Sequence, residues 1–381
     1  MIRFFTSIGG FLLGALLFTF LMIIAFNPNF FAEKALKDFT KDLATPATNS
    51  LDKFLDESVL KPILDNPETL TRLGLHQLDF LTNHNEKLDD YSVEKAEENH
   101  EEFLKYYSKL NSFDEVKLPG PAKLNLQVAK FSAGIEKRGF EKFRYFMGPF
   151  IQFYGSHLHF VNFMTDTHRL DSKNDAADYI KRVNEIPRVI DELMVFEERR
   201  ANAGIYSPNF VYEKSLNQLI SLIETPTNNH PLYLSFIEGI EKIEISADEK
   251  AEMVIELEDA IKIFKTSYAK LKNLVEKNSL GAREFDGVWS LPNGEDYYKH
   301  RLQIYTTTDL TADEIHNLGL KLVKEIQSEI KSILTNEGYD IRTPLAELFI
   351  ELNSDPRFLF EDSDKGREAV SYTHLTLPTT D

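Results

Sequence analysis

The sequence predicts a mainly α-helical protein, a multi-helix assembly with at most a small β element, preceded by an N-terminal transmembrane helix. Three observations support this fold class. Apolar residues recur at three- and four-residue intervals over long segments, which is the periodicity of one helix face. Capping motifs mark several helix starts, and segments that alternate apolar and polar residues, as half-buried strands do, are few.

The composition limits the chemistry of this chain. It has 381 residues, a formal net charge of −18, and 61 acidic against 43 basic residues. We expect no nucleic-acid partner, because phosphate contacts require clustered Lys and Arg. The chain has no cysteine, which excludes disulfides, thiolate zinc sites, iron–sulfur clusters, cysteine nucleophiles and a lipidated cysteine.

Residues 1–32 form the predicted membrane anchor or signal segment. No charged residue occurs from Phe4 to Ala32, and residues 4–26 as a helix would span roughly 35 Å, enough for a bilayer core of about 30 Å. With Arg3 in the cytoplasm, this helix would hold the chain in the lipid of the bacterial inner membrane as a single-pass protein, with its body in the periplasm. The alternative is a signal peptide whose cleavage leaves a secreted body, although residues 27–32 contain no A-x-A pattern.

Helix starts are frequent in the body, residues 33–370. Asn66 precedes a proline and a glutamate, which is typical of a cap followed by the first helical turn. Ser92 opens a charged helical segment that continues to Leu110, and Ser207-Pro208 begins a later helix.

A long helical segment begins at Asn174 and should end at Gly204, a residue suited to a helix C-terminus. Pro187 lies inside this segment. Because proline lacks an N–H and its ring clashes with the preceding turn, we expect a kink or a split there.

Two capping boxes begin helices at Ser246 and Thr311, each with a glutamate three residues later. An apolar stripe follows each box, and we interpret both stripes as core-packing faces. The first stripe consists of Val254, Leu257, Ile261, Phe264, Tyr268, Leu271 and Val275. The second consists of Ile315, Leu318, Leu322, Ile326, Ile330 and Ile333.

The best strand signal is the segment Arg301–Thr308, which is rich in β-branched and aromatic residues. Residues 287–296 contain the only tryptophan and a Pro-Asn-Gly turn. A boundary between two subdomains is expected between the linker-like residues 277–287 and the helix that starts at Thr311.

The histidines do not form a recognisable zinc motif. A helical zinc protease requires H-E-x-x-H, but Leu104 stands where the second histidine should follow His100. A second cluster contains His157, His159, Asp166 and His168. In an extended segment the first two would share a side and could share a metal ion, whereas on a helix they would lie about 200° apart. The flanking apolar residues favour the helix and ordinary hydrogen-bonded histidines.

Motifs for nucleophilic catalysis or phosphate binding are missing as well. The sequence has no G-x-S-x-G elbow, no G-x-x-x-x-G-K-[ST] loop and no G-x-G-x-x-G. We interpret the carboxylate pairs Glu101-Glu102 and Glu197-Glu198 as exposed surface rather than acid–base catalysts. We therefore predict no catalytic residue and no metal ligand in this chain.

Three ordered stretches resemble a known family. They are residues 186–208 (with the motif RRANAGI), residues 291–298 (LPNGEDYY) and residues 310–320 (LTADEIHNLGL), and residues 355–358 (DPRF) also fit. Together, over roughly residues 50–370, they resemble the bacterial domain of unknown function 885. Its members are similar to exported or lipid-anchored α-helical proteins related to H-E-x-x-H zinc metallopeptidases.

The resemblance implies that the chain is the N-terminal part of a membrane-anchored periplasmic zinc-dependent peptidase-like hydrolase. Zinc and a peptide substrate are expected for the full-length protein. The family's H-E-x-x-H helix lies further toward the C-terminus than this chain reaches, so no catalytic group transfers to it and we expect it to be inactive. The alternative is a non-catalytic, membrane-tethered helical binding or scaffold protein.

The resemblance also implies candidate substrate-cleft residues, because the family's G-x-x-x-L-P-x-G-x-x-Y-Y stretch precedes the catalytic half. Alternatively, this stretch is a simple turn whose tyrosines cap a hydrophobic core. The candidates are Trp289, Asn293, Tyr297, Tyr298 and Arg301.

The final segment, residues 371–381, matches no structural pattern and resembles the translation of sequencing-adapter DNA. We expect it to be non-native, so His374 carries no functional argument, and we expect the natural protein to continue beyond residue 370. The alternative is a genuine flexible tail. A missing partner would leave apolar helix faces exposed, and the candidates are residues 315–333 and 345–352.

Overall fold

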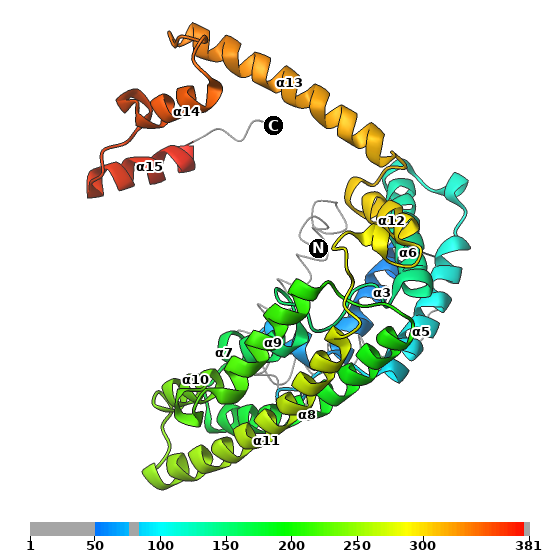
Figure 1. The fold of residues 1–381 in the computed structure, drawn as a ribbon, viewed down its shortest axis with the longest axis vertical. Coiled ribbons are helices and arrows are strands. Elements are labelled where there is room, and N and C mark those ends of the chain that lie inside the picture. Colours follow the sequence, from blue (N-terminus) through cyan, green and yellow to red (C-terminus); the bar gives the residue numbers. More distant parts are fainter. Residues whose placement is uncertain (1–49, 76–83, 377–381) are drawn as a thin grey trace. The chain divides into compact units, whose positions relative to one another are not determined.

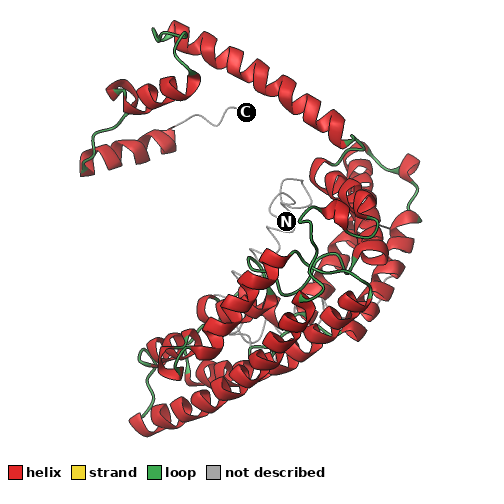
Figure 2. Ribbon diagram, viewed as in Figure 1, coloured by secondary structure: helices red, strands yellow, loops and turns green. Residues whose placement is uncertain are grey.

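The structure is a computed structural model that describes residues 50–75 and 84–376, and its regular elements in this part are helices (Figures 1 and 2). The chain divides into two compact units, Met1–His300 and Arg301–Asp381. This division falls in the interval where the sequence predicts a subdomain boundary. The predicted anchor, residues 1–32, lies outside the described residues. None of the described helices combines the length and the apolar composition needed to cross a bilayer.

The first unit contains nine complete α-helices among the described residues, followed by the first part of α12. Their bounds are α3 (Leu51–Asp65), α4 (Pro67–Arg72), α5 (Val93–Asn111), α6 (Gly120–Phe143), α7 (Ser156–Asp166), α8 (Lys173–Asn202), α9 (Asn209–Glu224), α10 (Pro231–Ile240), α11 (Ala247–Ser279) and α12 (Gly294–Thr306).

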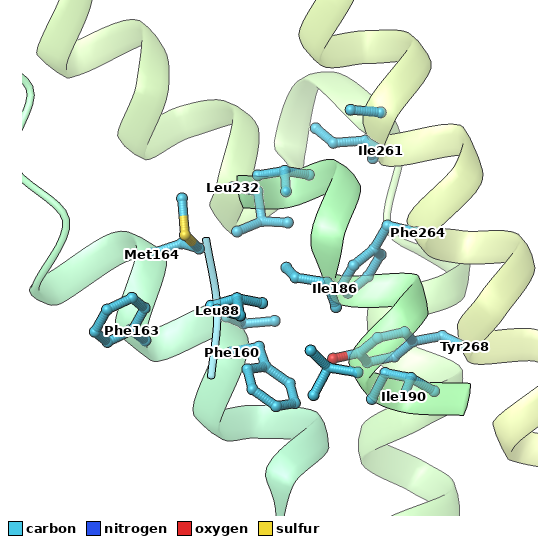
Figure 3. Packing of buried hydrophobic residues seen from close by; sticks show 14 of the residues in the cluster. Leu88, Phe160, Phe163, Met164, Ile186, Ile190, Leu232, Ile261, Phe264 and Tyr268 are labelled. Carbon is cyan, nitrogen blue, oxygen red and sulfur yellow. The ribbon is translucent and has the colours of Figure 1, made fainter. Parts of the chain in front are cut away.

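The main core lies where α11 packs along α8 and α9, with α7 and α10 closing it (Figure 3). The predicted stripe of α11 is confirmed as a core face, since its members are buried apart from the partly buried Val254. Phe264 and Tyr268 stack with ring centroids 3.9 Å apart, and the Tyr268 hydroxyl donates to His157 O at 2.8 Å. Burying one such side chain stabilises the fold by about 1.5–3 kcal/mol.

A smaller core joins α3, α5 and α6. Leu110 and Leu126 are fully buried in it, and Phe54 stacks on Tyr106 with centroids 5.2 Å apart.

Helix ends follow local rules that the sequence predicts. Both capping boxes form, at Ser246 and at Thr311, and Ser92 caps α5 by accepting from Lys95 N. Gly204 has a φ of +73°, a left-handed conformation that glycine adopts without strain, and it follows α8 as predicted.

Helix α8 continues through Pro187 as a single element, so the structure shows no split there. The flanking residues Ile186, Val189 and Ile190 are fully buried. Tertiary packing of this apolar face holds the helix together across the one backbone hydrogen bond that proline cannot make.

The predicted strand at residues 301–308 is wrong. Residues 301–306 form the last turns of α12, and Thr307 ends the helix with a φ of +55°. Glu295 and Asp296 in the first turn and the Glu295–Lys299 ion pair favour the helix, which overrides the β propensity of the threonines. The only β feature among the described residues is an isolated bridge between Pro208 and Arg283.

The second unit contains α13 (Ala312–Asn336), α14 (Leu345–Ser354) and α15 (Asp364–Thr376). The sequence analysis interpreted the apolar stripe of α13 as a core-packing face. Within this unit the stripe is not buried, so that interpretation is wrong here. Leu318, Leu322, Ile326 and Ile333 are 44–54% exposed. On α14, Ile350 is 68% exposed although Leu348 is buried. Within this unit, these apolar faces remain largely uncovered. Helix α15 includes residues 371–376 of the segment predicted to be non-native, and the rest of that segment lies outside the described residues.

Candidate functional site

Arg283 joins the motif stretch at residues 186–208 to the turn at residues 287–290, within the first unit. Its Nε donates to Tyr206 O at 2.9 Å, and its Nη1 donates to Gly287 O at 2.8 Å and to Ser290 Oγ. The neighbouring backbone forms the bridge to Pro208. Five guanidinium donors in a fixed geometry suit this task, because a turn offers several carbonyl groups that would otherwise be unpaired.

The turn held by Arg283 presents two of the predicted cleft residues. Trp289 is 66% exposed and packs on Phe285 with ring centroids 5.0 Å apart. Asn293 is exposed and has a φ of 54°, in the left-handed region that asparagine tolerates. A Cβ on Gly294 would lie only 1.9 Å from Val288 O, so this turn requires glycine.

The two predicted cleft tyrosines, Tyr297 and Tyr298, differ in their exposure to solvent. Tyr297 is half-buried, with its ring centroid 4.8 Å from Phe146 and 5.5 Å from Phe143. Tyr298 is 46% exposed. The position of Tyr297 agrees with the alternative interpretation, a tyrosine that covers an aromatic core.

Arg301 is the first residue of the second unit. It donates from Nη2 to the Tyr305 hydroxyl at 2.6 Å, and its guanidinium lies 4.9 Å from that ring's centroid. The structure therefore brings Trp289, Asn293, Tyr297 and Tyr298 together on one turn and the helix that follows it. Their role toward a substrate stays a prediction.

The prediction that the Glu197-Glu198 pair is exposed is wrong for Glu197. Its side chain is buried and pairs with Arg200 at 3.0 Å, while Asn278 donates to the same oxygen at 3.5 Å. Arg200 also donates to Tyr145 O at 2.8 Å. Burial raises the pKa of Glu197, although Arg200 opposes this shift. A buried ion pair of this kind fixes how neighbouring segments meet, and breaking it leaves an uncompensated charge.

The histidines of α7 do not face one another. His157 is fully buried and donates from Nε2 to Gln218 Oε1 at 2.9 Å, while His159 Nε2 lies 2.8 Å from Glu68 Oε2. The helix carries them to different neighbours, as their spacing predicts. Burial lowers the pKa of His157, which favours its neutral form.

Both ring nitrogens of His168 also form hydrogen bonds. Arg182 can only donate, so His168 Nδ1 accepts from it at 2.9 Å, and Nε2 then donates to Asp175 O at 3.0 Å. His100 stacks on Phe140 with centroids 4.0 Å apart. Across the described part of the chain, no group of three or more His, Asp and Glu side chains is placed to hold a metal ion. The described residues therefore do not fit a catalytic zinc ion.

Arg182 is a fully buried cation of the first unit that the sequence analysis missed. It donates to His84 O at 2.7 Å, to Lys87 O at 2.8 Å and to Thr71 Oγ1 at 3.0 Å. Its guanidinium also lies 5.0 Å from the centroid of the Phe163 ring. Desolvation lowers the pKa of Arg182 to about 10, so it remains charged at neutral pH. Arg182 thus joins α8 to chain segments about 100 residues away.

Glu68, whose burial the sequence analysis also missed, is another buried charge and is only 2% exposed. Its Oε2 accepts from His159, and its Oε1 accepts from the Tyr91 hydroxyl at 3.0 Å and from Asp89 N at 3.3 Å. Burial opposes ionisation of Glu68, but these hydrogen bonds outweigh it and lower its pKa. Glu68 is therefore an ionised carboxylate whose two oxygens are both occupied.

Comparison with protein families gives a match described as "Bacterial protein of unknown function (DUF885)" over residues 67–373. This match includes all three motif stretches and most of the chain. The chain belongs to the DUF885 family. The resemblance read from residues 186–208, 291–298 and 310–320 is thereby confirmed.

The DUF885 chain is similar to a solved structure described as "the putative lipoprotein from Colwellia psychrerythraea". The TM-score is 0.64 at 21% sequence identity, and the match covers 83% of this chain and 57% of that one. This similarity shows a shared fold, and our chain spans little more than half the length of that relative. Comparison with the curated proteins finds no match.

Proposed function

We propose that this chain forms the helical, non-catalytic N-terminal portion of an envelope-associated zinc-dependent peptidase-like hydrolase. The proposal rests on membership of the DUF885 family, combined with the metallopeptidase relationship that the motifs imply. Zinc would be held by residues beyond this chain, because the H-E-x-x-H motif does not occur in its sequence.

The observation that carries this proposal is the exposed apolar face of α13. At 100° per residue, Leu318, Leu322, Ile326, Ile330 and Ile333 cover an arc of about 120° on one side of the helix. A stripe this wide is typical of a helix packed in a globular core, whereas a two-helix coiled coil uses a narrower seam. Full burial of each such side chain contributes about 1.5–3 kcal/mol, so a covering domain would stabilise this unit substantially.

In the same proposal, Trp289, Asn293, Tyr297, Tyr298 and Arg301 wall the substrate cleft, and the substrate is a peptide. Trp289 is well suited to this role, because it is 66% exposed and held on a turn that Arg283 fixes. Tryptophan on a rigid support contributes a large contact area with little loss of conformational entropy.

The proposal places the body in the periplasm of a bacterial inner-membrane protein anchored by residues 4–26. Their uncharged and predominantly apolar sequence supports this placement, and the solved relative described as a putative lipoprotein supports an association with the cell envelope. Protease accessibility in spheroplasts, with and without permeabilisation, tests it.

The functional test compares this chain with the full-length gene product from the source genome. Both are assayed against a mixed peptide library with zinc and with a chelator. We expect chelator-sensitive cleavage by the full-length protein and none by this chain. Metal-dependent cleavage by the chain alone would refute the proposal, and an inactive full-length protein would favour the scaffold alternative.

The cleft assignment is tested in the active full-length protein with Trp289→Ala. We expect KM to rise about tenfold, since truncating an aromatic contact of this size costs on the order of 1.4 kcal/mol. Val116→Ala is the control, because Val116 is 90% exposed on a surface turn far along the sequence from the motifs. An unchanged KM in the tryptophan variant removes it from the cleft.

A further inference from the structure

A cavity of about 250 Å³ lies in the first unit, beside α7 and the end of α4. Its apolar wall includes Phe163, and the aromatic pair Phe153 and Tyr154 stands at its edge. These two aromatic side chains are 72% and 90% exposed. None of the predicted cleft residues lines this cavity, so it is separate from the proposed function and does not depend on it.

The polar wall of the cavity is formed by Arg72 and His159. Behind them, the buried Glu68 carboxylate accepts from His159 Nε2 at 2.8 Å and lies 3.7 Å from Arg72 Nη2. Since an ionised carboxylate only accepts, the His159 Nε2 proton points at Glu68, and the 3.5 Å contact between Arg72 and His159 is not a hydrogen bond to that nitrogen. Glu68 therefore fixes both cavity side chains from a position that solvent does not reach.

Arg72 keeps most of its hydrogen-bonding capacity. Its side chain is 52% exposed, its Nη2 faces Glu68, and within residues 50–75 and 84–376 its Nε and Nη1 donate to no protein group. Its guanidinium also lies 5.6 Å from the centroid of the Phe163 ring. The N–H groups of a guanidinium that do not face the protein can donate charge-assisted hydrogen bonds to the carboxylate of a ligand.

We propose that this cavity binds the free carboxylate of a small organic ligand, with Arg72 as the recognition cation and the aromatic wall contacting an apolar group of the ligand. The volume suits a ligand of amino-acid or short-peptide-end size, below the range of drug-sized pockets. Such a carboxylate occurs on a small organic acid and at the C-terminus of a peptide, and the two sources share this chemistry.

Asp166 provides a second test of the proposal, because its charge should affect ligand affinity in the opposite direction to that of Arg72. It also lines the cavity and is exposed. Its negative charge would weaken the binding of an anion but not that of an apolar molecule. Neutralising Arg72 and neutralising Asp166 should therefore change affinity in opposite directions.

The test is an NMR titration of this chain with benzoate and with a matched peptide pair, acetyl-Ala-Ala-Phe with a free C-terminus and its C-terminal amide. We expect binding of the free acid forms, and at least tenfold weaker binding by the amide. Arg72→Gln should weaken binding at least tenfold, and Asp166→Asn should strengthen it two- to fivefold. Arg199→Gln is the matched control, because Arg199 is 43% exposed and also pairs with one carboxylate, Glu94; it should leave affinity unchanged.

Each outcome decides the proposal. Binding of both free acids that depends on Arg72 supports it, and the tighter of the two identifies the source of the carboxylate. Equal binding of the amide, no binding of either acid, or equal affinity in the Arg72 and Arg199 variants would overturn it. Circular dichroism of each variant shows whether the fold persists, and if Arg72→Gln unfolds, the Asp166→Asn result alone decides.

Discussion

Arg182 offers the sharpest test of how this fold is held together, because two large contributions of opposite sign meet at one buried side chain. Replacing Arg182 with Met removes a fully buried cation. Desolvation, partly opposed by Glu68, Asp178 and Asp89, lowers the pKa of Arg182 from 12.5 to about 10, a net cost to the charged form of about 3 kcal/mol. Removing the charge recovers this amount.

Against this gain stand four hydrogen bonds of 2.7–3.0 Å, to His84 O, Lys87 O, His168 Nδ1 and Thr71 Oγ1. Hydrogen bonds to charged groups contribute about 1.5–3 kcal/mol each, or roughly 6–12 kcal/mol in sum. The hydrogen bonds outweigh this cost by roughly 3–9 kcal/mol. We expect Arg182→Met to destabilise the chain by about 3–5 kcal/mol, the lower part of this range and the usual loss for a broken buried polar network.

The assay is urea unfolding at pH 7, followed by circular dichroism and by the fluorescence of the single tryptophan, Trp289. Arg182→Lys should lose about 2 kcal/mol, since an ammonium group keeps the charge but cannot reach all four acceptors. Arg169→Met, at an exposed position, is the control and should change stability by less than about 0.5 kcal/mol. A loss below about 1 kcal/mol in Arg182→Met would refute the reasoning, because the hydrogen bonds would then do no more than offset desolvation.

Three further predictions concern other parts of the chain. Because the pKa of Glu197 is raised in the folded protein, the free energy of unfolding should fall as the pH rises above the ordinary pKa of 4.5. The Glu197→Gln variant lacks this titration, so its stability relative to wild type should increase between pH 4.5 and pH 7 in urea unfolding. A difference that stays constant with pH contradicts this. Gly294→Ala should lower the melting temperature, because a Cβ would lie 1.9 Å from a carbonyl oxygen. Gly319→Ala has open space around it on α13 and should stabilise the chain by about 0.5–1 kcal/mol. Calorimetry of the two variants must therefore show changes in melting temperature of opposite sign. The exposed apolar face of α13 should promote self-association of this chain, and exchanging Leu322 and Ile326 for Lys should reduce it in analytical ultracentrifugation. Both side chains are already about half exposed, so the melting temperature should not fall. A large fall in the melting temperature would show that the face is packed.

Features governed by nearby residues were predictable from the sequence. The capping boxes at Ser246 and Thr311 depend on contacts three residues apart, and both form. The strand at residues 301–308 failed because its β-branched residues lie at the end of a helix whose start, at Gly294, was read only as a turn.

The buried charges show what local patterns cannot supply. Arg182 occupies the apolar side of α8, three residues after Tyr179 and four before Ile186, and this position was a readable signal of a buried cation. Its acceptors at Thr71 and His84 are about 100 residues distant, and no local pattern connects them to α8. The same limit applies to Glu68, whose partner His159 lies 91 residues away.

Helices α11 and α13 sharpen this limit, because they begin with the same capping box and carry the same apolar periodicity. The stripe of α11 is buried because α8 and α9 cover it, whereas the stripe of α13 is about half exposed. Periodicity therefore identifies the apolar face of a helix but not its partner, which depends on residues distant in the chain or on another surface. If adding the remainder of the full-length protein protects Leu322 and Ile326 from solvent, the proposed larger hydrolase gains its physical basis. If they stay exposed there, the apolar face of α13 no longer supports that proposal, and the scaffold alternative becomes the better account of this surface.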